Sequence, residues 1–157
     1  GQIVSSDGDP WVGREQEAIA SGEAIYHSTA KCYSCHPGYV TPATLAELNG
    51  LPADAEPRPD FTYPIAKATH NYEVLGHPML LLPPDFTWND VRAGTTPLDL
   101  FETIGAGIGG TAMPQWKGAL PDEDIWAMGY YVEHLIKTYK GKPVERAAFM
   151  AGLRKDS

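Results

Sequence analysis

Two cysteines and a histidine are the residues of this sequence whose types and spacing point most directly to chemistry: Cys32, Cys35 and His36. The pattern C-x-x-C-H is the attachment signature of a c-type haem. Two thiols three positions apart can each form a thioether with one haem vinyl group, and the histidine that follows can place an imidazole nitrogen on the iron. Both cysteines of the chain belong to this pattern, so none remains for a disulfide.

A C-x-x-C pair has two other interpretations. It can be a thioredoxin-like redox pair, which needs a βαβ setting that this sequence does not predict. It can also be half of a zinc site, whose other two ligands would have to come from scattered histidines: His27, His70, His77 and His134. The histidine that directly follows the second cysteine favours the haem interpretation.

A methionine in a stiff loop is the predicted second axial ligand. Met113 lies between a glycine-rich stretch and Pro114, a setting that suits the presentation of a sulfur to a metal. A thioether paired with histidine favours ferrous iron and raises the reduction potential. Met113 could instead be an ordinary core residue. The other candidates for the sixth position are Met79, which is the main rival, and Met128, Met150, His70 and His77.

Two further residues are candidates for contacts with the haem, and His36 itself is expected to have a hydrogen-bond partner. Trp116 and Arg92 could hydrogen-bond or pair with the haem propionates, although a core tryptophan and a solvated arginine are equally compatible with the sequence. His36 is expected to donate its second ring N–H to a backbone carbonyl, as ligating histidines usually do. A carbonyl near Pro83 or Pro84 is a candidate acceptor.

One glycine pattern is set aside. Gly105, Gly107 and Gly110 fit G-x-G-x-x-G, but a dinucleotide fingerprint must follow a strand and open a helix. Here the glycines follow a helical pattern, so nucleotide binding is not predicted. We expect them to let the backbone pass close to the haem face.

Three stretches of the chain resemble class I monohaem cytochromes c, in the order in which that family has them. Residues 22–36 resemble the first helix and haem site, 103–114 the distal-methionine loop and 122–132 the C-terminal helix; residues 84–87 belong to the same resemblance. The resemblance implies an all-α fold packed around one covalently bound haem c and a role in electron transfer. It also implies a periplasmic or otherwise extracytoplasmic location, because cells attach haem c there.

The elements that must position these residues are mainly helices. Apolar periodicity and start signals predict them over about 12–28, from Pro42 to Asn49-Gly50, from Pro97 onward, over 122–140 and from Pro143 onward. Leu98, Phe101 and Ile104 are expected to share one face of the third. The resemblance places Gly22 against the C-terminal helix near Tyr131, where a side chain would block close approach.

Length and charge narrow the classes of protein. One domain is predicted over 1–157, with an extended irregular insertion at 37–83 and a C-terminal extension at 143–157. No stretch approaches the ~20 apolar residues of a transmembrane helix. The net charge is −8, which argues against nucleic acid as a partner and could steer a basic protein partner towards the haem edge.

The sequence therefore predicts an electron carrier rather than an enzyme, with redox proteins as its partners. One alternative is the haem-bearing electron-entry subunit of a larger oxidoreductase, which the long insertion slightly favours because it suggests a dedicated partner with a basic docking surface. Another is a haem enzyme or gas sensor in which Met113 dissociates. The lack of an evident acid–base pair beside the methionine loop argues against that second alternative.

Overall fold

The structure is a computed structural model that describes residues 8–52, 72–74, 77–79 and 83–153. Helices dominate the described residues, which confirms the predicted all-α class; one short hairpin is the exception. In chain order the elements are α1 (Glu15–His27), the 3-10 turn η1 (Cys32–Ser34), α2 (Pro42–Leu48), β1 (Tyr72–Val74), β2 (His77–Met79), α3 (Pro97–Ala106), α4 (Asp122–Tyr139) and α5 (Pro143–Gly152).

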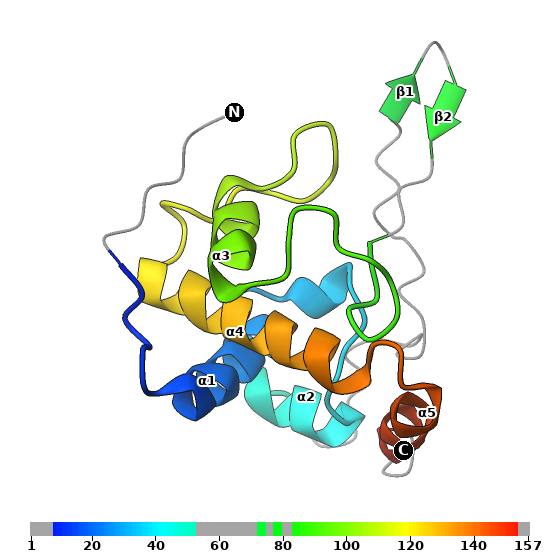
Figure 1. Cartoon of the computed structure of the whole chain (residues 1–157). Helices are drawn as coiled ribbons and strands as arrows, with labels where there is room; N and C mark the ends of the chain where they lie inside the picture. The colour runs from blue at the N-terminus through cyan, green and yellow to red at the C-terminus, as the bar shows by residue number, and fades with distance from the viewer. Residues whose placement is uncertain (1–7, 53–71, 75–76, 80–82, 154–157) are drawn as a thin grey trace.

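Helix α4 is the centre of the fold, with α1 packed across it on one side and α3 on the other (Figure 1). The crossing with α1 depends on Gly22, because a Cβ there would lie 2.1 Å from the carbonyl oxygen of Ala127 and 2.8 Å from the Cβ of Tyr131. This confirms the predicted contact between Gly22 and the C-terminal helix. The close approach lets α4 bury side chains on nearly every side from Ile125 to Val132.

Helix α3 begins where the sequence predicts but buries a different face. Thr96 and Asp99 form a capping box, in which each side chain accepts the other residue's backbone N–H. Leu100, Phe101 and Ile104 are buried, whereas Leu98 is 47% exposed. Leu98 was expected to share one face with Phe101 and Ile104, and this was wrong. The face of α3 that packs on α4 contains Leu100, Phe101 and Ile104, and Leu98 lies outside it.

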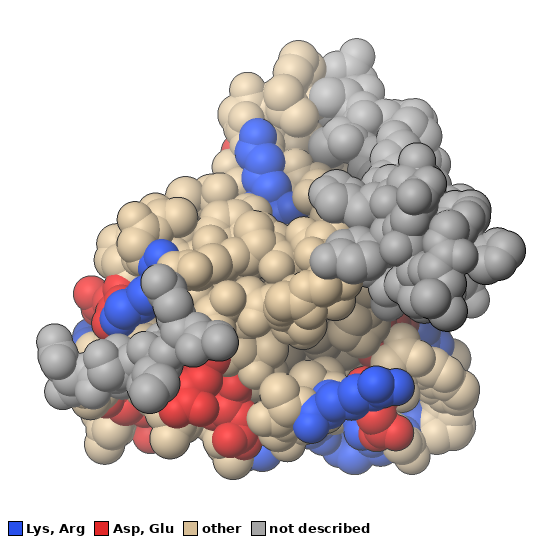
Figure 2. All heavy atoms as spheres, turned by 90° about the horizontal axis from the view of Figure 1, so that it is seen from above, with Lys and Arg blue, Asp and Glu red and all other residues tan. Residues whose placement is uncertain are grey.

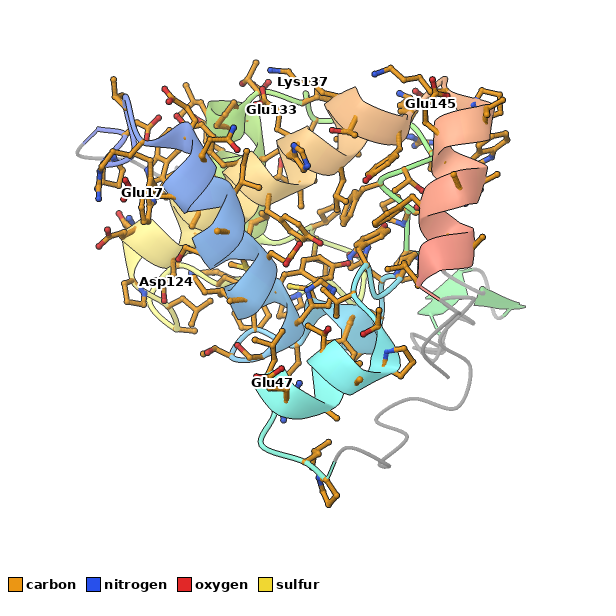
Figure 3. The ribbon with its side chains drawn as sticks, turned by 90° about the horizontal axis from the view of Figure 1, so that it is seen from below. Glu17, Glu47, Asp124, Glu133, Lys137 and Glu145 are labelled. Carbon is orange, nitrogen blue, oxygen red and sulfur yellow. The ribbon has the colours of Figure 1, made fainter. Side chains whose placement is uncertain are left out.

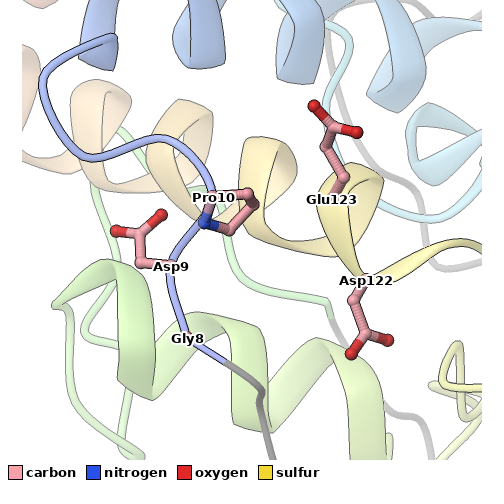
Figure 4. Close-up of a pocket in the computed structure, with 5 residues that line it drawn as sticks. All are labelled: Gly8, Asp9, Pro10, Asp122 and Glu123. Carbon is pink, nitrogen blue, oxygen red and sulfur yellow. The ribbon is translucent and has the colours of Figure 1, made fainter.

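The N-terminal segment is attached to the start of α4, which delays the start of α1. The Trp11 indole donates to the carbonyl of Glu123 (3.0 Å), and the Tyr130 hydroxyl donates to Asp9 (2.5 Å). Figure 4 shows Gly8, Asp9 and Pro10 running past the first turn of α4, where Asp122 and Glu123 lie. Gly13 then adopts a left-handed φ of 78°, so α1 begins at Glu15 and not near Val12 as predicted.

The insertion at 37–83 is not irregular throughout. Thr41 caps α2 as predicted, accepting the N–H of Thr44, and β1 pairs antiparallel with β2 in the register Tyr72↔Met79. The tyrosine and valine of β1 suit a strand, and Pro78 is tolerated in β2 because each strand of a two-stranded sheet is an edge. Residues 53–71, 75–76 and 80–82 lie outside the described residues.

Helix α5 forms most of the C-terminal extension and lies against the end of α4. Phe149 stacks on Tyr139 with ring centroids 4.3 Å apart and an interplanar angle of 14°. Leu153 follows the helix and is buried. None of the described helices is both long and apolar enough to cross a membrane.

Candidate haem site

One short turn carries both cysteines and the histidine. Lys31 enters it with a left-handed φ of 49°. The backbone N–H groups of Cys35 and His36 then both donate to the carbonyl of Cys32, at 3.1 and 2.9 Å. The two cysteines are not joined by a disulfide, so both sulfurs are available for thioether formation.

The cysteine chemistry does not suit a thioredoxin-like redox pair. Burial raises the pKa of the Cys32 thiol to about 12, whereas redox cysteines are activated by a lowered pKa. The described residues also contain no parallel sheet, only the hairpin of β1 and β2. Both observations argue against a thioredoxin-like redox pair.

His36 has the orientation that a metal-binding histidine needs. Its Nδ1 lies 3.0 Å from the carbonyl oxygen of Pro84. Because a carbonyl oxygen can only accept a hydrogen bond, Nδ1 carries the proton and donates it. This confirms the expected acceptor. With the proton on Nδ1, the ring presents the lone pair for a metal at Nε2. The ring also stacks on Phe86, with centroids 4.8 Å apart and planes 21° apart.

The segment that contacts His36 is held by a network from distant parts of the chain. Asp85 accepts from the Tyr39 hydroxyl (3.1 Å), from the backbone and hydroxyl of Thr87 (2.9 and 2.6 Å) and from Arg146 (2.7 Å). Burial alone would raise the pKa of Asp85, but the hydrogen bonds from Thr87 and Arg146 outweigh burial and lower that pKa. The Phe86 N–H donates to the Tyr39 hydroxyl (2.9 Å).

The zinc alternative fails at its first candidate ligand. His27 is fully buried, its Nδ1–H donates to the carbonyl of Glu23 (2.8 Å), and its Nε2 accepts from the N–H of Tyr39 (2.9 Å). Burial lowers the pKa of His27 to about 4, which keeps it neutral. The described residues bring no three His, Cys, Asp or Glu side chains together as metal ligands. Labelled carboxylates such as Glu17, Glu47 and Glu145 lie apart on different helices (Figure 3).

The loop that carries Met113 is built from local hydrogen bonds. The Met113 N–H donates to the Thr111 hydroxyl (3.1 Å), and the Met113 carbonyl accepts from Ile108 (3.3 Å). The side chain of Met113 is partly buried and packs against the hydrophobic core. Gly107 has a φ of 67°, and a Cβ there would lie 2.7 Å from the backbone of Pro114.

The glycines of this loop serve the loop itself. Gly105 is the penultimate residue of α3 and follows no strand, which excludes the dinucleotide fingerprint. Gly107 makes room for the returning chain at Pro114. The expected passage of the glycine backbone along a haem face stays a prediction.

The remaining candidate residues have differing surroundings. Met128 is 1% exposed in the core of α4, and Met150 is partly buried in α5. Trp116 packs against the core, while Arg92 is exposed before α3. Their predicted contacts with propionates stay predictions. His70 lies outside the described residues, and only the backbone is described at the two candidates in β2, His77 and Met79.

Sequence reasoning named the carbonyl of Pro84 as a candidate acceptor but missed the other residues that position the histidine. Pro84 and Phe86 belong to a stretch that carried part of the family resemblance, but Arg146 lies in an extension that the resemblance does not cover. Tyr39 and Arg146 are 46 and 61 residues from Asp85. No spacing rule connects residues that far apart.

Comparisons with known proteins define the family. Residues 17–132 match the sequence model of the family described as cytochrome C oxidase, cbb3-type, subunit III. The chain belongs to this family of cytochrome c domains. No curated protein matches it. A chain of the Kuenenia stuttgartiensis reducing HAO-like protein complex is similar, with 26% identity, a TM-score of 0.49 and coverage of 77% of this chain. The match spans 44% of that chain.

Membership of a cytochrome c family implies covalently bound haem c and haem-based electron transfer. The donor set fits that group: two cysteines at the attachment spacing, a histidine whose Nδ1 proton is committed to Pro84, and a thioether in a tight loop. In this arrangement Cys32 and Cys35 would hold the haem, and His36 and Met113 would bind its iron. The haem would supply a centre that accepts and releases one electron.

Proposed function

We propose that this chain carries one electron between redox proteins on a haem c attached through Cys32 and Cys35, with His36 and Met113 as axial ligands. The hydrogen bond from His36 Nδ1 to Pro84 carries the proposal, because it commits the imidazole to the tautomer that ligates through Nε2. The stacked Phe86 ring limits rotation of the imidazole. A fixed ligand geometry keeps reorganisation small when the charge on the iron changes.

The absorption spectra of both oxidation states test the proposal. Acid–acetone extraction of the denatured protein should leave the haem on the polypeptide. Met113→Ala should abolish the far-red sulfur-to-iron charge-transfer band and lower the reduction potential, because a thioether favours ferrous iron. Met128→Leu, a volume-conserving change in the core, should preserve both. Haem that moves into the solvent would refute covalent attachment, and a band that survives Met113→Ala would point to Met79.

A second candidate function is electron entry into a larger oxidoreductase. The description of the matching family, an oxidase subunit, favours it. The stretch 103–116 contains no charged residue, Ile108 is 45% exposed within it, and the upper face to which α3 and the following loop belong shows few charged side chains (Figure 2). Such a surface suits docking to another protein. Stable co-purification of the native protein with an oxidoreductase would select this function over a free carrier.

A haem enzyme or gas sensor is the less supported alternative. The uncharged stretch around Met113 also lacks histidine, so it provides no local acid–base group. The loop's hydrogen bonds hold Met113 in place. We therefore expect the ferrous protein to bind little or no carbon monoxide at neutral pH, and rapid binding would favour this alternative.

The partner, location and domain organisation complete the proposal. A net charge of −8 suits a partner with a basic docking surface, so the electron-transfer rate should fall as salt rises. We place the protein in the periplasm or another extracytoplasmic compartment, where fractionation should recover it. We also propose one domain over 1–157, which should unfold in a single cooperative transition.

A further inference from the structure

The C-terminal helix α5 reaches the segment that contacts His36. Arg146 donates from one terminal nitrogen to Asp85 (2.7 Å) and from Nε to the Thr87 hydroxyl (2.8 Å). These two residues flank Phe86, whose ring stacks on the imidazole. Asp85 directly follows Pro84, which accepts the His36 N–H. The Arg146 guanidinium therefore holds the segment by hydrogen bonds at two points, as its planar set of N–H donors allows.

The surroundings of this ion pair make the grip strong. The side chains of Arg146 and Asp85 are 27% and 15% exposed, and Thr87 is fully buried. Charge-assisted hydrogen bonds with this little exposure are stronger than those of surface pairs. The guanidinium also lies over the ring of Trp88, 5.2 Å from its centroid. Movement of the segment would break several of these contacts together.

We propose that Arg146 is a positioning residue for His36, which fixes the Pro84 carbonyl and the Phe86 ring against the imidazole and thereby sets the haem reduction potential. The inference rests on the proposed axial role of His36. A carbonyl that accepts the Nδ1 proton makes the imidazole a better donor, and a better donor favours ferric iron. A loosened segment should therefore weaken this bond and raise the potential.

The test must separate the positioning role of Arg146 from the effect of its positive charge. Loss of a cation near the haem by itself lowers the reduction potential, whereas loss of positioning should raise it. Arg146→Lys keeps the charge but loses the fork that grips Asp85 and Thr87 together. Phe149→Ala removes the stack that anchors α5 on Tyr139 without changing any charge. Lys140→Met is the matched control, since Lys140 pairs with Asp90 in the same region and does not contact Asp85.

Redox titration and NMR of the haem-loaded proteins give the two readouts. Arg146→Lys and Phe149→Ala should both raise the reduction potential and accelerate solvent exchange of the His36 Nδ1 proton. Lys140→Met should leave that exchange unchanged and should not raise the potential. Unchanged potential and exchange in both test variants, or an equal rise in Lys140→Met, would overturn the positioning role. A wild-type protein whose His36 resonances lack the shifts of an axial ligand would instead refute the proposed function.

Discussion

The two candidate ligands of the iron are held in opposite ways. His36 is positioned by contacts from far along the chain: the carbonyl of Pro84 is 48 residues away, and the network behind it extends to Arg146. Met113 is positioned by hydrogen bonds within its own loop, to Thr111 and Ile108. On the histidine side Phe86 and Thr87 are buried and His36 and Pro84 are partly buried, whereas Thr111 and Ile108 are exposed.

This difference indicates how the two sides respond to change. Disturbing the histidine side breaks contacts between elements, so its orientation should depend on the stability of the whole fold. The methionine loop can open by exchanging a few exposed hydrogen bonds for bonds to water, at a cost of only about 1 kcal/mol each. Local opening of this kind is typical of exposed loops. We therefore expect ligand exchange to begin at Met113.

The largest effect is expected from a substitution that disrupts the crossing of α1 and α4, on which both sides of the site depend. In Gly22→Val the new side chain would meet the backbone of α4 at Ala127, which cannot move aside as a flexible side chain can. Overpacking usually costs about 1–3 kcal/mol, and we expect a loss above that range in the free energy of unfolding. Gly152→Val, at a helical glycine with open space around it, is the control. Equal urea midpoints for the two variants would show that α1 and α4 do not cross as described.

A smaller effect is expected from His27, a buried residue on the histidine side, whose protonation should lower the stability of the folded protein. Its pKa is about 4 in the folded protein against 6.5 in the unfolded chain, so the unfolded state binds more protons between these values. The stabilisation is complete above pH 6.5 and is lost as the pH falls to about 4, a change of up to about 3 kcal/mol. His27→Gln cannot titrate and should show a smaller loss in urea unfolding between pH 7 and 4.5. If the stability of the wild type and of His27→Gln fell equally between these pH values, His27 would not have the lowered pKa.

The smallest expected effect should act on the methionine loop alone. Thr111→Val removes the hydroxyl that accepts the Met113 N–H and donates to Ile108. Because these bonds are exposed, stability should fall by less than about 1 kcal/mol. The rate of carbon monoxide binding to the ferrous protein should nevertheless rise, because the sulfur is held less firmly. Thr138→Val on α4 should leave this rate unchanged, and an equal rate in Thr111→Val would show that the loop's hydrogen bonds do not hold the ligand.

Local signals predicted most of the helices and both halves of the candidate site. Thr41 and Thr96 precede prolines and cap their helices as expected, because capping depends on only a few neighbouring residues. The attachment pattern at Cys32–His36 and the loop at Met113 are also short segments. Errors appeared where packing selects between local options, as at Leu98, or where a turn precedes the helix, as at Gly13.

The sequence by itself determined which residues can bind a haem, because their chemistry and spacing lie within short stretches around Cys32 and Met113. Only the tertiary structure decided how the histidine is held. The contacts of Pro84, Asp85 and Arg146 join segments that are up to 61 residues apart. They form only when folding places α5 beside residues 84–87. Hydrogen bonds between distant residues leave no periodicity or spacing in a single sequence, so folding alone brings them together.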